Sequence, residues 1–354
     1  MDIEERIALV KRQPVCEIVT EGELRELFES NAHPKHYIGF EISGKVHLGS
    51  GLLTALLIED FIKAGIKPTI FLADYHAWIN GKMGGDLERI QQAAKGYFRS
   101  AFVSLGLGED RVKYCLASEM YGPDYWKEVL RISKDTSIQR MLRCTTIMGR
   151  SQKEALDCAS VLYPAMQAAD IGMLGADIAH AGIDQRKVHM LAREISERRG
   201  GKKPVAVHHK LMMGLLGPQR MGIEENAAED AEISSKMSKS KPDSCIFVHD
   251  SPAEIARKLK GAYCPEKVTE KNPVLEMCEC FIFRDEKASL KVSRPAKFGG
   301  DAEFFSYAKL RDAYVSGKLH PMDLKNAVGE ALSKMLEPSR KYFGKHSELL
   351  SQVK

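Results

Sequence analysis

The sequence has no pair of cysteines at metal-binding spacing, and little from which a disulfide framework could be built. Its eight cysteines include no C-x-x-C, and only one residue separates Cys278 from Cys280. This pattern fits neither a structural zinc site nor a small disulfide-stabilised scaffold. We therefore expect reduced structural thiols, as in a cytoplasmic protein, and no metal site built from side chains.

Long apolar segments are also missing. The longest run, Leu52 to Ile58, is interrupted by Thr54 and falls well short of the roughly 20 residues that cross a bilayer. The first six residues carry three acidic side chains and no apolar stretch, so we expect neither a secretory signal nor a membrane anchor. Hydrophobic residues make up 44% of the chain and charged residues 28%, which is ordinary for a globular protein.

What the chain does have is length and an uneven distribution of charge. With 354 residues it is long enough for two domains, each with its own core. The net charge is +4, yet residues 251–354 alone carry 19 Lys and Arg against 14 Asp and Glu. A basic C-terminal third beside a nearly neutral body indicates contact with a polyanion such as RNA, although a solvated basic surface would have the same composition.

Residues 37–50 have the pattern of a strand that leads through a turn into a helix. Tyr37–Phe40 is a short apolar run typical of a buried strand, and Ser43 with Gly44 marks a turn. Apolar residues then recur at helical spacing, which predicts a helix over His47–Ala64.

His47 and Gly49 would lie in the first turn of this helix, where backbone N–H groups lack intrahelical partners. Such a helix start binds anions, because the free N–H groups and the helix dipole both favour negative charge. His47 could donate to a phosphate oxygen, and Gly49 leaves room for a flat ligand close to the backbone. By itself, the pattern is also that of an ordinary helix start in an α/β protein.

Further alternation of strands and helices predicts the fold. Apolar runs at 69–73, 177–181 and 205–210 indicate strands, with helical periodicity over most of the sequence between them. This alternation predicts an α/β fold with a doubly wound, parallel, Rossmann-like sheet. Asp74 and His76 follow the strand at 69–73, and in such sheets ligands bind beyond the carboxyl ends of the strands.

The remaining segments define the expected domain organisation. We expect an α/β domain over 1–233 with a mostly helical insertion at about 84–160, a loop and linker over 234–250, and an all-helical C-terminal domain over 251–354. Helices are expected within 1–30, and 112–116 is a possible strand inside the insertion.

Lys236-Met-Ser-Lys-Ser240 lies on a segment of weak periodicity after the last predicted strand. Lys236 and Lys239 would bring two positive charges to a polyphosphate, and a loop that closes during the reaction stabilises the transition state preferentially. Taken alone, these five residues could be an exposed charged loop. Combined with a His-x-Gly helix start on the first half of the sheet, they indicate an enzyme that uses ATP.

Together, His47-Leu-Gly-Ser50 and Lys236-Met-Ser-Lys-Ser240 resemble the two signature motifs of class I aminoacyl-tRNA synthetases. One departure is Ser50, because the family motif commonly has a second histidine there. Six further segments are similar to the archaeal and eukaryotic branch of the tyrosyl-tRNA synthetases: 37–41, 72–76, 163–170, 185–194, 297–301 and 320–328. The resemblance spans nearly the whole chain and is weakest in the insertion.

The resemblance implies a pocket for L-tyrosine. Tyr37 and Asp170 would bind the phenol hydroxyl, which needs one donor and one acceptor in an apolar pocket. Tyr163, Gln167 and Gln185 would hold the ammonium group. Because Tyr163, Gln167 and Asp170 are spaced at i, i+4 and i+7, one helix face can present all three. Without the resemblance, Tyr163 and Gln167 would be taken for ordinary packing and surface residues.

The resemblance also implies ATP as a substrate, accompanied by Mg²⁺ without a dedicated protein cage. His47, Lys236 and Lys239 would be catalytic through positioning and charge stabilisation, with no covalent enzyme intermediate. The residues expected to contact the nucleotide are Gly49, Ser50, Met237, Ser238 and Lys239.

A tRNA specific for tyrosine is the implied macromolecular partner. Arg186 and Lys187 follow the site glutamine and would contact the acceptor end, with Arg140 and Arg143 in the insertion as weaker candidates. The resemblance also implies a homodimer joined through the insertion.

Recognition of the anticodon would fall to the C-terminal domain. Phe298 would stack on an unpaired base, while His320 and Asp323 form hydrogen bonds with its edge. Phe298 could instead be a core residue and Asp323 a helix cap.

These inferences combine into activation of L-tyrosine by ATP to tyrosyl-adenylate and pyrophosphate, followed by transfer of tyrosine to the terminal adenosine of its tRNA. A tryptophanyl-tRNA synthetase is a rival, disfavoured by Tyr37 with Asp170 because an indole N–H is only a donor. A second rival is an RNA-binding protein that kept the fold and lost catalysis. The intact Lys236–Ser240 motif argues against it.

Overall fold

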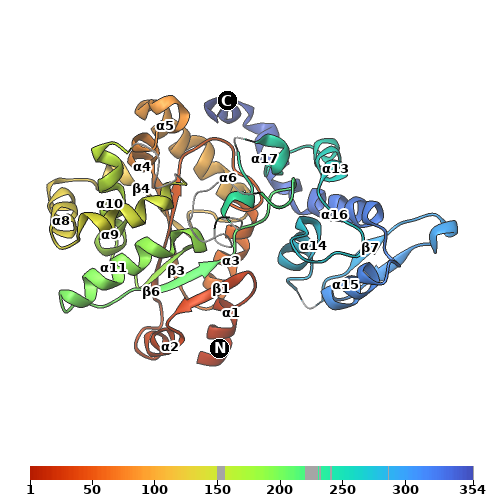
Figure 1. Ribbon diagram of the computed structural model, residues 1–354, viewed down its shortest axis with the longest axis horizontal. Coiled ribbons are helices and arrows are strands. Elements are labelled where there is room, and N and C mark those ends of the chain that lie inside the picture. Colours follow the sequence, from red (N-terminus) through yellow and green to blue (C-terminus); the bar gives the residue numbers. More distant parts are fainter. Residues whose placement is uncertain (150–155, 220–229, 231–232, 240, 286, 354) are drawn as a thin grey trace.

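A computed structural model describes residues 1–149, 156–219, 230, 233–239, 241–285 and 287–353, with Phe298 described by its backbone only. Its centre is a six-stranded sheet with the order β1-β6-β5-β2-β3-β4 (Figure 1). The strands are β1 Val15–Val19, β2 Lys35–Glu41, β3 Lys67–Ala73, β4 Lys113–Leu116, β5 Ile178–Gly182 and β6 Val205–His209.

Five of these strands run parallel, which confirms the predicted doubly wound sheet. The sheet grows outward in both directions from β2, so the strand order reverses between β2 and β5, the position where such sheets bind ligands. β1 was not predicted, because we expected only helices within residues 1–30. It pairs antiparallel to β6 at one edge of the sheet.

Helices cover both faces of the sheet. In the N-terminal part these are α1 Ile3–Val10, α2 Glu21–Ser30, α3 Leu52–Lys63, α4 Asp74–Ile79, η1 Lys82–Gly85, α5 Leu87–Ala93, η2 Ala94–Phe98 and α6 Arg99–Ser104. The second group is α7 Ala117–Met120, α8 Pro123–Lys134, α9 Ile138–Cys144, η3 Thr145–Met148, α10 Cys158–Met173, η4 Ile183–Gln185 and α11 Arg186–Arg198.

Alternate strand residues divide the core into two layers. Ile38 of β2 and Ile70 of β3 pack with α1, α2, α3 and α6 on one face. Tyr37, the residue before Ile38, and Phe71, the residue after Ile70, pack with α8, α10 and α11 on the other face. This alternation places the Tyr37 side chain among the helices that carry the second half of the site.

The predicted start of the helix at His47 is wrong: α3 begins at Leu52. The His47 imidazole accepts hydrogen bonds from the backbone N–H groups of Gly49 and Ser50 (3.1 and 3.3 Å), which holds 47–51 in a turn. A side chain that bonds nearby N–H groups competes with the helix in this way. His47 and Gly49 therefore precede the first turn of α3.

Within the predicted insertion, the possible strand at 112–116 is confirmed as β4, which pairs in parallel with β3. This part of residues 84–160 therefore belongs to the sheet. The mostly helical character expected for the rest of this segment is found in α8, α9 and η3.

The C-terminal third is mostly helical but contains two short antiparallel strands, so the all-helical prediction is wrong there. Its elements are η5 Pro242–Ser244, α13 Pro252–Gly261, α14 Pro273–Met277, η6 Cys278–Ile282, β7 Leu290–Val292, η7 Ala296–Phe298, β8 Ala302–Phe304, α15 Tyr307–Val315, α16 Pro321–Met335, α17 Glu337–Lys345 and η8 Ser347–Val353. Ser251 and His320 cap α13 and α16, and each helix has a proline at its first position.

A buried ion-pair cluster joins this third to the α/β part. The Asp60 carboxylate of α3 is 2.9 Å from Arg12 and 2.5 Å from Arg284, the latter from the C-terminal third. The chain end also returns, since Gln352 accepts a hydrogen bond from the backbone N–H of Tyr97. In Figure 1 the C-terminus lies beside α5 and α6. All eight cysteines lie within the described residues and none of them forms a disulfide. No described helix is long and apolar enough to cross a membrane.

Candidate active site

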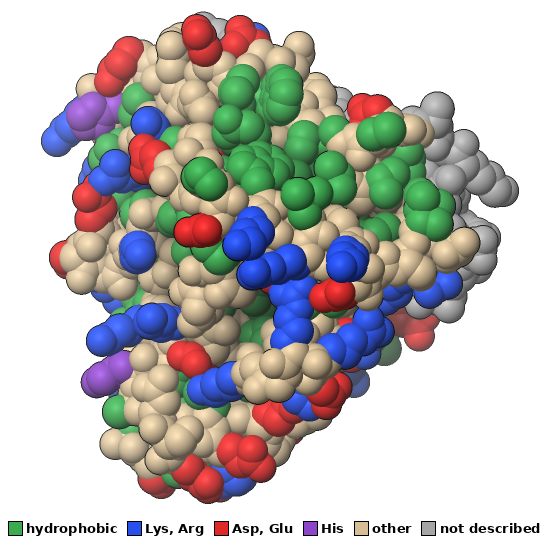
Figure 2. Space-filling model, turned by 90° about the vertical axis from the view of Figure 1, so that its left-hand side faces the viewer, with side chains coloured by type: hydrophobic (Ala, Val, Ile, Leu, Met, Phe, Trp, Pro, Cys, Tyr) green, Lys and Arg blue, Asp and Glu red, His purple; other side chains and the backbone are tan. Residues whose placement is uncertain are grey.

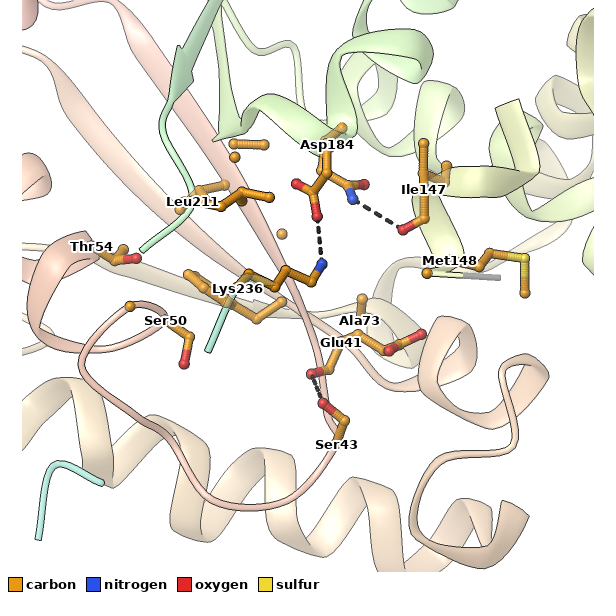
Figure 3. Close-up of a pocket in the computed structure, with 18 of the residues that line it drawn as sticks. Glu41, Ser43, Ser50, Thr54, Ala73, Ile147, Met148, Asp184, Leu211 and Lys236 are labelled. Atoms are coloured by element: carbon orange, nitrogen blue, oxygen red, sulfur yellow. Dashed lines mark hydrogen bonds and ion pairs between the residues drawn. The ribbon is translucent and has the colours of Figure 1, made fainter. Parts of the chain in front are cut away.

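A cavity of about 580 Å³ opens at the carboxyl ends of the central strands (Figure 3). Glu41, Ala73, Gly182 and His209, the last residues of β2, β3, β5 and β6, all line it. The cavity thus lies at the reversal of strand order. The predicted residues that line it are Tyr37, His47, Gly49, Ser50, Tyr163, Gln167, Asp170, Gln185, Lys236, Met237, Ser238 and Lys239.

At one end of the cavity, α10 presents Tyr163, Gln167 and Asp170, all of them buried. This confirms the helix and the shared face that their spacing predicts. The Gln167 amide donates to the side-chain oxygen of Gln185 (3.3 Å), and Gln185 in turn donates to the carbonyl of Ile147 (3.0 Å). The Tyr163 hydroxyl donates to Glu41 at 3.3 Å. Oxygen acceptors therefore surround this part of the cavity, as a bound ammonium group requires.

Asp170 has one satisfied oxygen and one free oxygen. Its Oδ1 accepts hydrogen bonds from the hydroxyls of Tyr121 (2.8 Å) and Tyr125 (3.0 Å), whose rings stack on each other. Its Oδ2 is buried and has no hydrogen-bond partner. Burial raises the pKa of the Asp170 carboxyl well above its usual range, and the two phenol hydrogen bonds act in the opposite direction. A ligand that donates to Oδ2 would stabilise the carboxylate further.

Tyr37 is buried on the same side, and the proximity of Asp170 adds to burial in raising the pKa of its phenol. Gly39, two residues along β2, makes room for it: a methyl group at Gly39 would meet the Tyr37 hydroxyl at 2.5 Å. The backbone at this position therefore needs glycine for the tyrosine to keep its place.

At the other end of the cavity lie His47 and the lysine loop. Because Nδ1 of His47 accepts two backbone N–H groups, its proton is on Nε2, the only ring nitrogen left to donate to a ligand. Burial, with smaller contributions from Lys239 and Lys236, lowers the pKa of His47 to about 3, so the imidazole is neutral. Ser50, where the family motif commonly has histidine, accepts from the backbone N–H of His47.

The two lysines of the loop reach the cavity from one side. Lys236 donates to the Asp184 carboxylate at 2.8 Å (Figure 3), and Lys239 donates to the Ser43 hydroxyl at 2.9 Å. Burial lowers the pKa of Lys239 to about 8, partly offset by Glu41. Ser240, the last residue of the motif, lies outside the described residues.

The residues predicted to contact tRNA lie elsewhere. Arg186 is paired with Glu17 at 2.9 Å, and Lys187 donates to Thr146 at 3.1 Å. Arg143 is exposed on α9. Arg140, the other candidate from the insertion, is paired with Glu194 at 2.8 Å.

In the C-terminal third, His320 is exposed and caps α16 through its Nδ1, which accepts from the backbone N–H of Met322. The alternative that Asp323 is the helix cap is therefore wrong, since Asp323 lies in the first turn of α16. The Phe298 side chain is outside the described part of the chain.

Sequence reasoning missed several residues of the cavity and its surroundings. Glu41 is the last residue of β2 and Asp184 lies two residues after the end of β5, so the rule on strand ends could have found them. Tyr121 and Tyr125 gave no such signal, because only tertiary packing brings the end of α7, with Tyr121, and α8, with Tyr125, to Asp170 of α10.

Comparisons with known proteins show the family to which the chain belongs. The family model described as "tRNA synthetases class I (W and Y)" matches residues 29–337. The chain therefore belongs to the class I tRNA synthetases of the tryptophan and tyrosine group.

Within that group its relatives are tyrosine–tRNA ligases. The one from Pyrococcus furiosus is 49% identical over 369 aligned positions, covering 100% of this chain and 98% of the relative. The solved structure of the Pyrococcus horikoshii tyrosyl-tRNA synthetase complexed with L-tyrosine is 49% identical, with a TM-score of 0.93 over 100% of this chain and 99% of that chain. The corresponding Archaeoglobus fulgidus structure, also complexed with L-tyrosine, is 40% identical, with a TM-score of 0.85 over 97% and 100% of the two chains.

Proposed function

We propose that this protein is an enzyme that activates L-tyrosine with ATP and transfers the tyrosine to the terminal adenosine of its tRNA. The observation that carries the substrate assignment is the buried carboxylate of Asp170, whose Oδ2 has no hydrogen-bond partner, in a residue that lines the same cavity as Tyr37. A phenol hydroxyl can donate to Oδ2 and accept from the Tyr37 hydroxyl. An indole N–H can only donate, and a phenyl ring can do neither.

The proposed chemistry requires no covalent intermediate on the protein. The tyrosine carboxylate attacks the α-phosphate of ATP, and pyrophosphate leaves with its electron pair. Negative charge therefore grows on the leaving phosphates, at the end of the cavity where His47, Lys236 and Lys239 lie. Preorganised donors stabilise developing charge without reorganising during the step. Gly49, Ser50, Met237 and Ser238 would contact the nucleotide in the same region.

We propose that Mg²⁺ enters with ATP and is held mainly by the phosphates. The cavity carries the carboxylates of Glu41 and Asp184, and Mg²⁺ typically takes one or two carboxylates together with substrate phosphates and water. Among the described residues, no group of three or more His, Cys, Asp or Glu is placed to hold a metal. When bound, the ion would neutralise phosphate charge.

Exchange of labelled pyrophosphate into ATP, measured with each amino acid in turn, tests the proposal. We expect exchange that depends on tyrosine. Exchange with tryptophan but not tyrosine would overturn the substrate assignment, and no exchange with any amino acid would favour an RNA-binding protein without catalysis.

For tRNA we propose contacts at both ends of the molecule. Arg143, Arg186 and Lys187 would meet the acceptor end near the cavity. Residues 251–354 would form the anticodon-binding domain, with Phe298, His320 and Asp323 contacting bases, and residues 1–233 the catalytic domain joined to it through 234–250. Charging of tRNA serves translation, so we place the protein in the cytoplasm.

We also propose a homodimer joined through the helices that follow β4. Exposed apolar side chains gather on α8 and α9: Trp126, Leu130, Ile138 and Leu142 are exposed by 38 to 65%. Figure 2, which views the α8 end of the molecule, shows hydrophobic side chains clustered on this face. Contiguous apolar surface of this kind is typical of protein–protein contacts.

Leu130→Asp is expected to convert the dimer into a monomer, because the interface would then bury an unpaired charge. Sedimentation velocity measures the change. Val315→Asp is a matched control, since Val315 is 47% exposed on α15, away from this face. A wild-type protein that is already monomeric at micromolar concentration would contradict the proposal.

A further inference from the structure

His76 of α4 is buried beside Asp170, and the sequence assigns it no role beyond its place after β3. It lines the cavity and is 2% exposed. Its Nε2 has no hydrogen-bond partner and lies 3.6 Å from Asp170 Oδ2, which has none either. Two buried polar atoms that face each other without a hydrogen bond are costly, and they mark a place where a ligand atom is missing.

The position of the imidazole proton follows from the neighbouring hydrogen bonds. The Tyr121 hydroxyl has one proton, which it donates to Asp170 Oδ1 at 2.8 Å. The same hydroxyl oxygen lies 3.3 Å from His76 Nδ1, so Nδ1 must carry a proton and donate it. Burial lowers the pKa of His76 to about 3, so the ring is neutral and has only that one proton. Nε2 therefore carries a lone pair that no donor meets, in a residue that lines the cavity.

We propose that His76 is a specificity-determining residue of the amino-acid pocket, sharing with Asp170 the proton of the substrate's phenol hydroxyl. An oxygen about 2.8 Å from both Nε2 and Oδ2 completes a triangle whose third side is the observed 3.6 Å. The hydroxyl then donates to both acceptors at once. A substrate without a donor at this position leaves both acceptors unpaired. This inference rests on the proposed tyrosine substrate and deepens it.

Contacts with neighbouring side chains hold the imidazole in this orientation. The ring packs edge-on against Tyr163, with centroids 4.5 Å apart and an interplanar angle of 88°. Nδ1 is tied to Tyr121, which also orients Asp170. The Tyr121 hydroxyl therefore bonds both side chains, which fixes Nε2 of His76 and Oδ2 of Asp170 relative to each other.

Substitution of His76, assayed with two amino acids, tests the proposal. His76→Leu should lower kcat/KM for tyrosine about tenfold in pyrophosphate exchange, the cost of one lost hydrogen bond to a buried group. It should leave the much slower reaction with phenylalanine unchanged, so that the ratio between the two falls about tenfold. His76→Gln, which can present an amide oxygen near the position of Nε2, should recover part of the loss. Equal losses with both amino acids would show a structural role only and overturn the inference.

Two tyrosine variants separate His76 from Asp170. Tyr125→Phe removes one hydrogen bond to Asp170, whereas Tyr121→Phe removes one to Asp170 and also the partner of His76 Nδ1. The selectivity for tyrosine should fall further in Tyr121→Phe, and equal effects of the two variants would overturn the orienting role. A wild-type enzyme without tyrosine-dependent exchange would instead defeat the proposed function, so the two failures are distinguishable.

Discussion

Replacing Asp170 by asparagine is expected to lower kcat/KM for tyrosine about 100-fold and to leave the reaction with phenylalanine nearly unchanged. The substitution keeps the shape and an oxygen that can accept from Tyr121 and Tyr125. In one orientation of the amide its oxygen faces Tyr121 and Tyr125, and the NH₂ group faces the phenol of the substrate where an acceptor is needed. In the other orientation the oxygen faces the phenol but carries no charge. Hydrogen bonds to charged groups are worth about 1.5–3 kcal/mol, which corresponds to about 10- to 150-fold.

The discrimination between tyrosine and phenylalanine should shrink by the same factor. A discrimination of about 10⁵ is the value known for tyrosyl-tRNA synthetases themselves. The geometry around Asp170 explains why tyrosine would be favoured over phenylalanine. A site that has buried polar groups for the phenol must leave them unpaired when phenylalanine binds.

Asp74→Asn provides the matched control for this prediction. Asp74 is also a fully buried carboxylate, but the protein itself satisfies it: the backbone N–H groups of Tyr75 and Ser118 and the amide of Gln91 all donate to it. We expect this variant to lower the melting temperature without changing the ratio of kcat/KM for tyrosine to kcat/KM for phenylalanine. An unchanged ratio in Asp170→Asn would remove Asp170 from the phenol subsite.

The comparison of sequence and structure explains which parts of the site could be foreseen. Tyr163, Gln167 and Asp170 were placed together because helical periodicity relates residues that are close in the chain. The contacts of Tyr121 and Tyr125 with Asp170 could not be foreseen, since they span 49 and 45 residues and depend on how the end of α7 and α8 pack against α10. Helical spacing therefore predicts that these three residues share one face of the helix. The side chains that surround Asp170 depend on tertiary packing, which spacing does not show.

The same distinction applies to the fold. Strands β2, β3, β5 and β6 are buried apolar runs and were predicted. β1 was missed because its five residues include Cys16 and Glu17, which interrupt the apolar run at an edge of the sheet. The start of α3 was placed too early, since hydrophobic spacing cannot show that His47 bonds the N–H groups of the turn before the helix.

Lys239→Ala is expected to lower kcat for tyrosyl-adenylate formation about 100- to 1000-fold, the usual effect of removing a preorganised group that stabilises charge in the transition state. Tyrosine binding should change little, because the proposed function places Lys239 against the phosphates of ATP and not against the amino acid. Single-turnover kinetics with quenched-flow detection of adenylate separates the two effects. Lys241→Ala is the control within the same loop, since its side chain is exposed; an equal loss in both variants would argue for a general disturbance of the loop.

The pH dependence gives this prediction a second readout. The pKa of Lys239 is lowered from its ordinary 10.5 to about 8, first by burial and then by the charges of Lys82 and Lys236. The lysine is therefore charged below about pH 8 and loses its charge as the pH rises through that value. Because kcat/KM reports the ionisation of the free enzyme, kcat/KM for ATP should fall above about pH 8 in the wild type. Lys239→Arg should keep its activity to higher pH, because a guanidinium stays protonated. The same alkaline decline in both proteins would assign it to another group and leave Lys239 without a charge-dependent role.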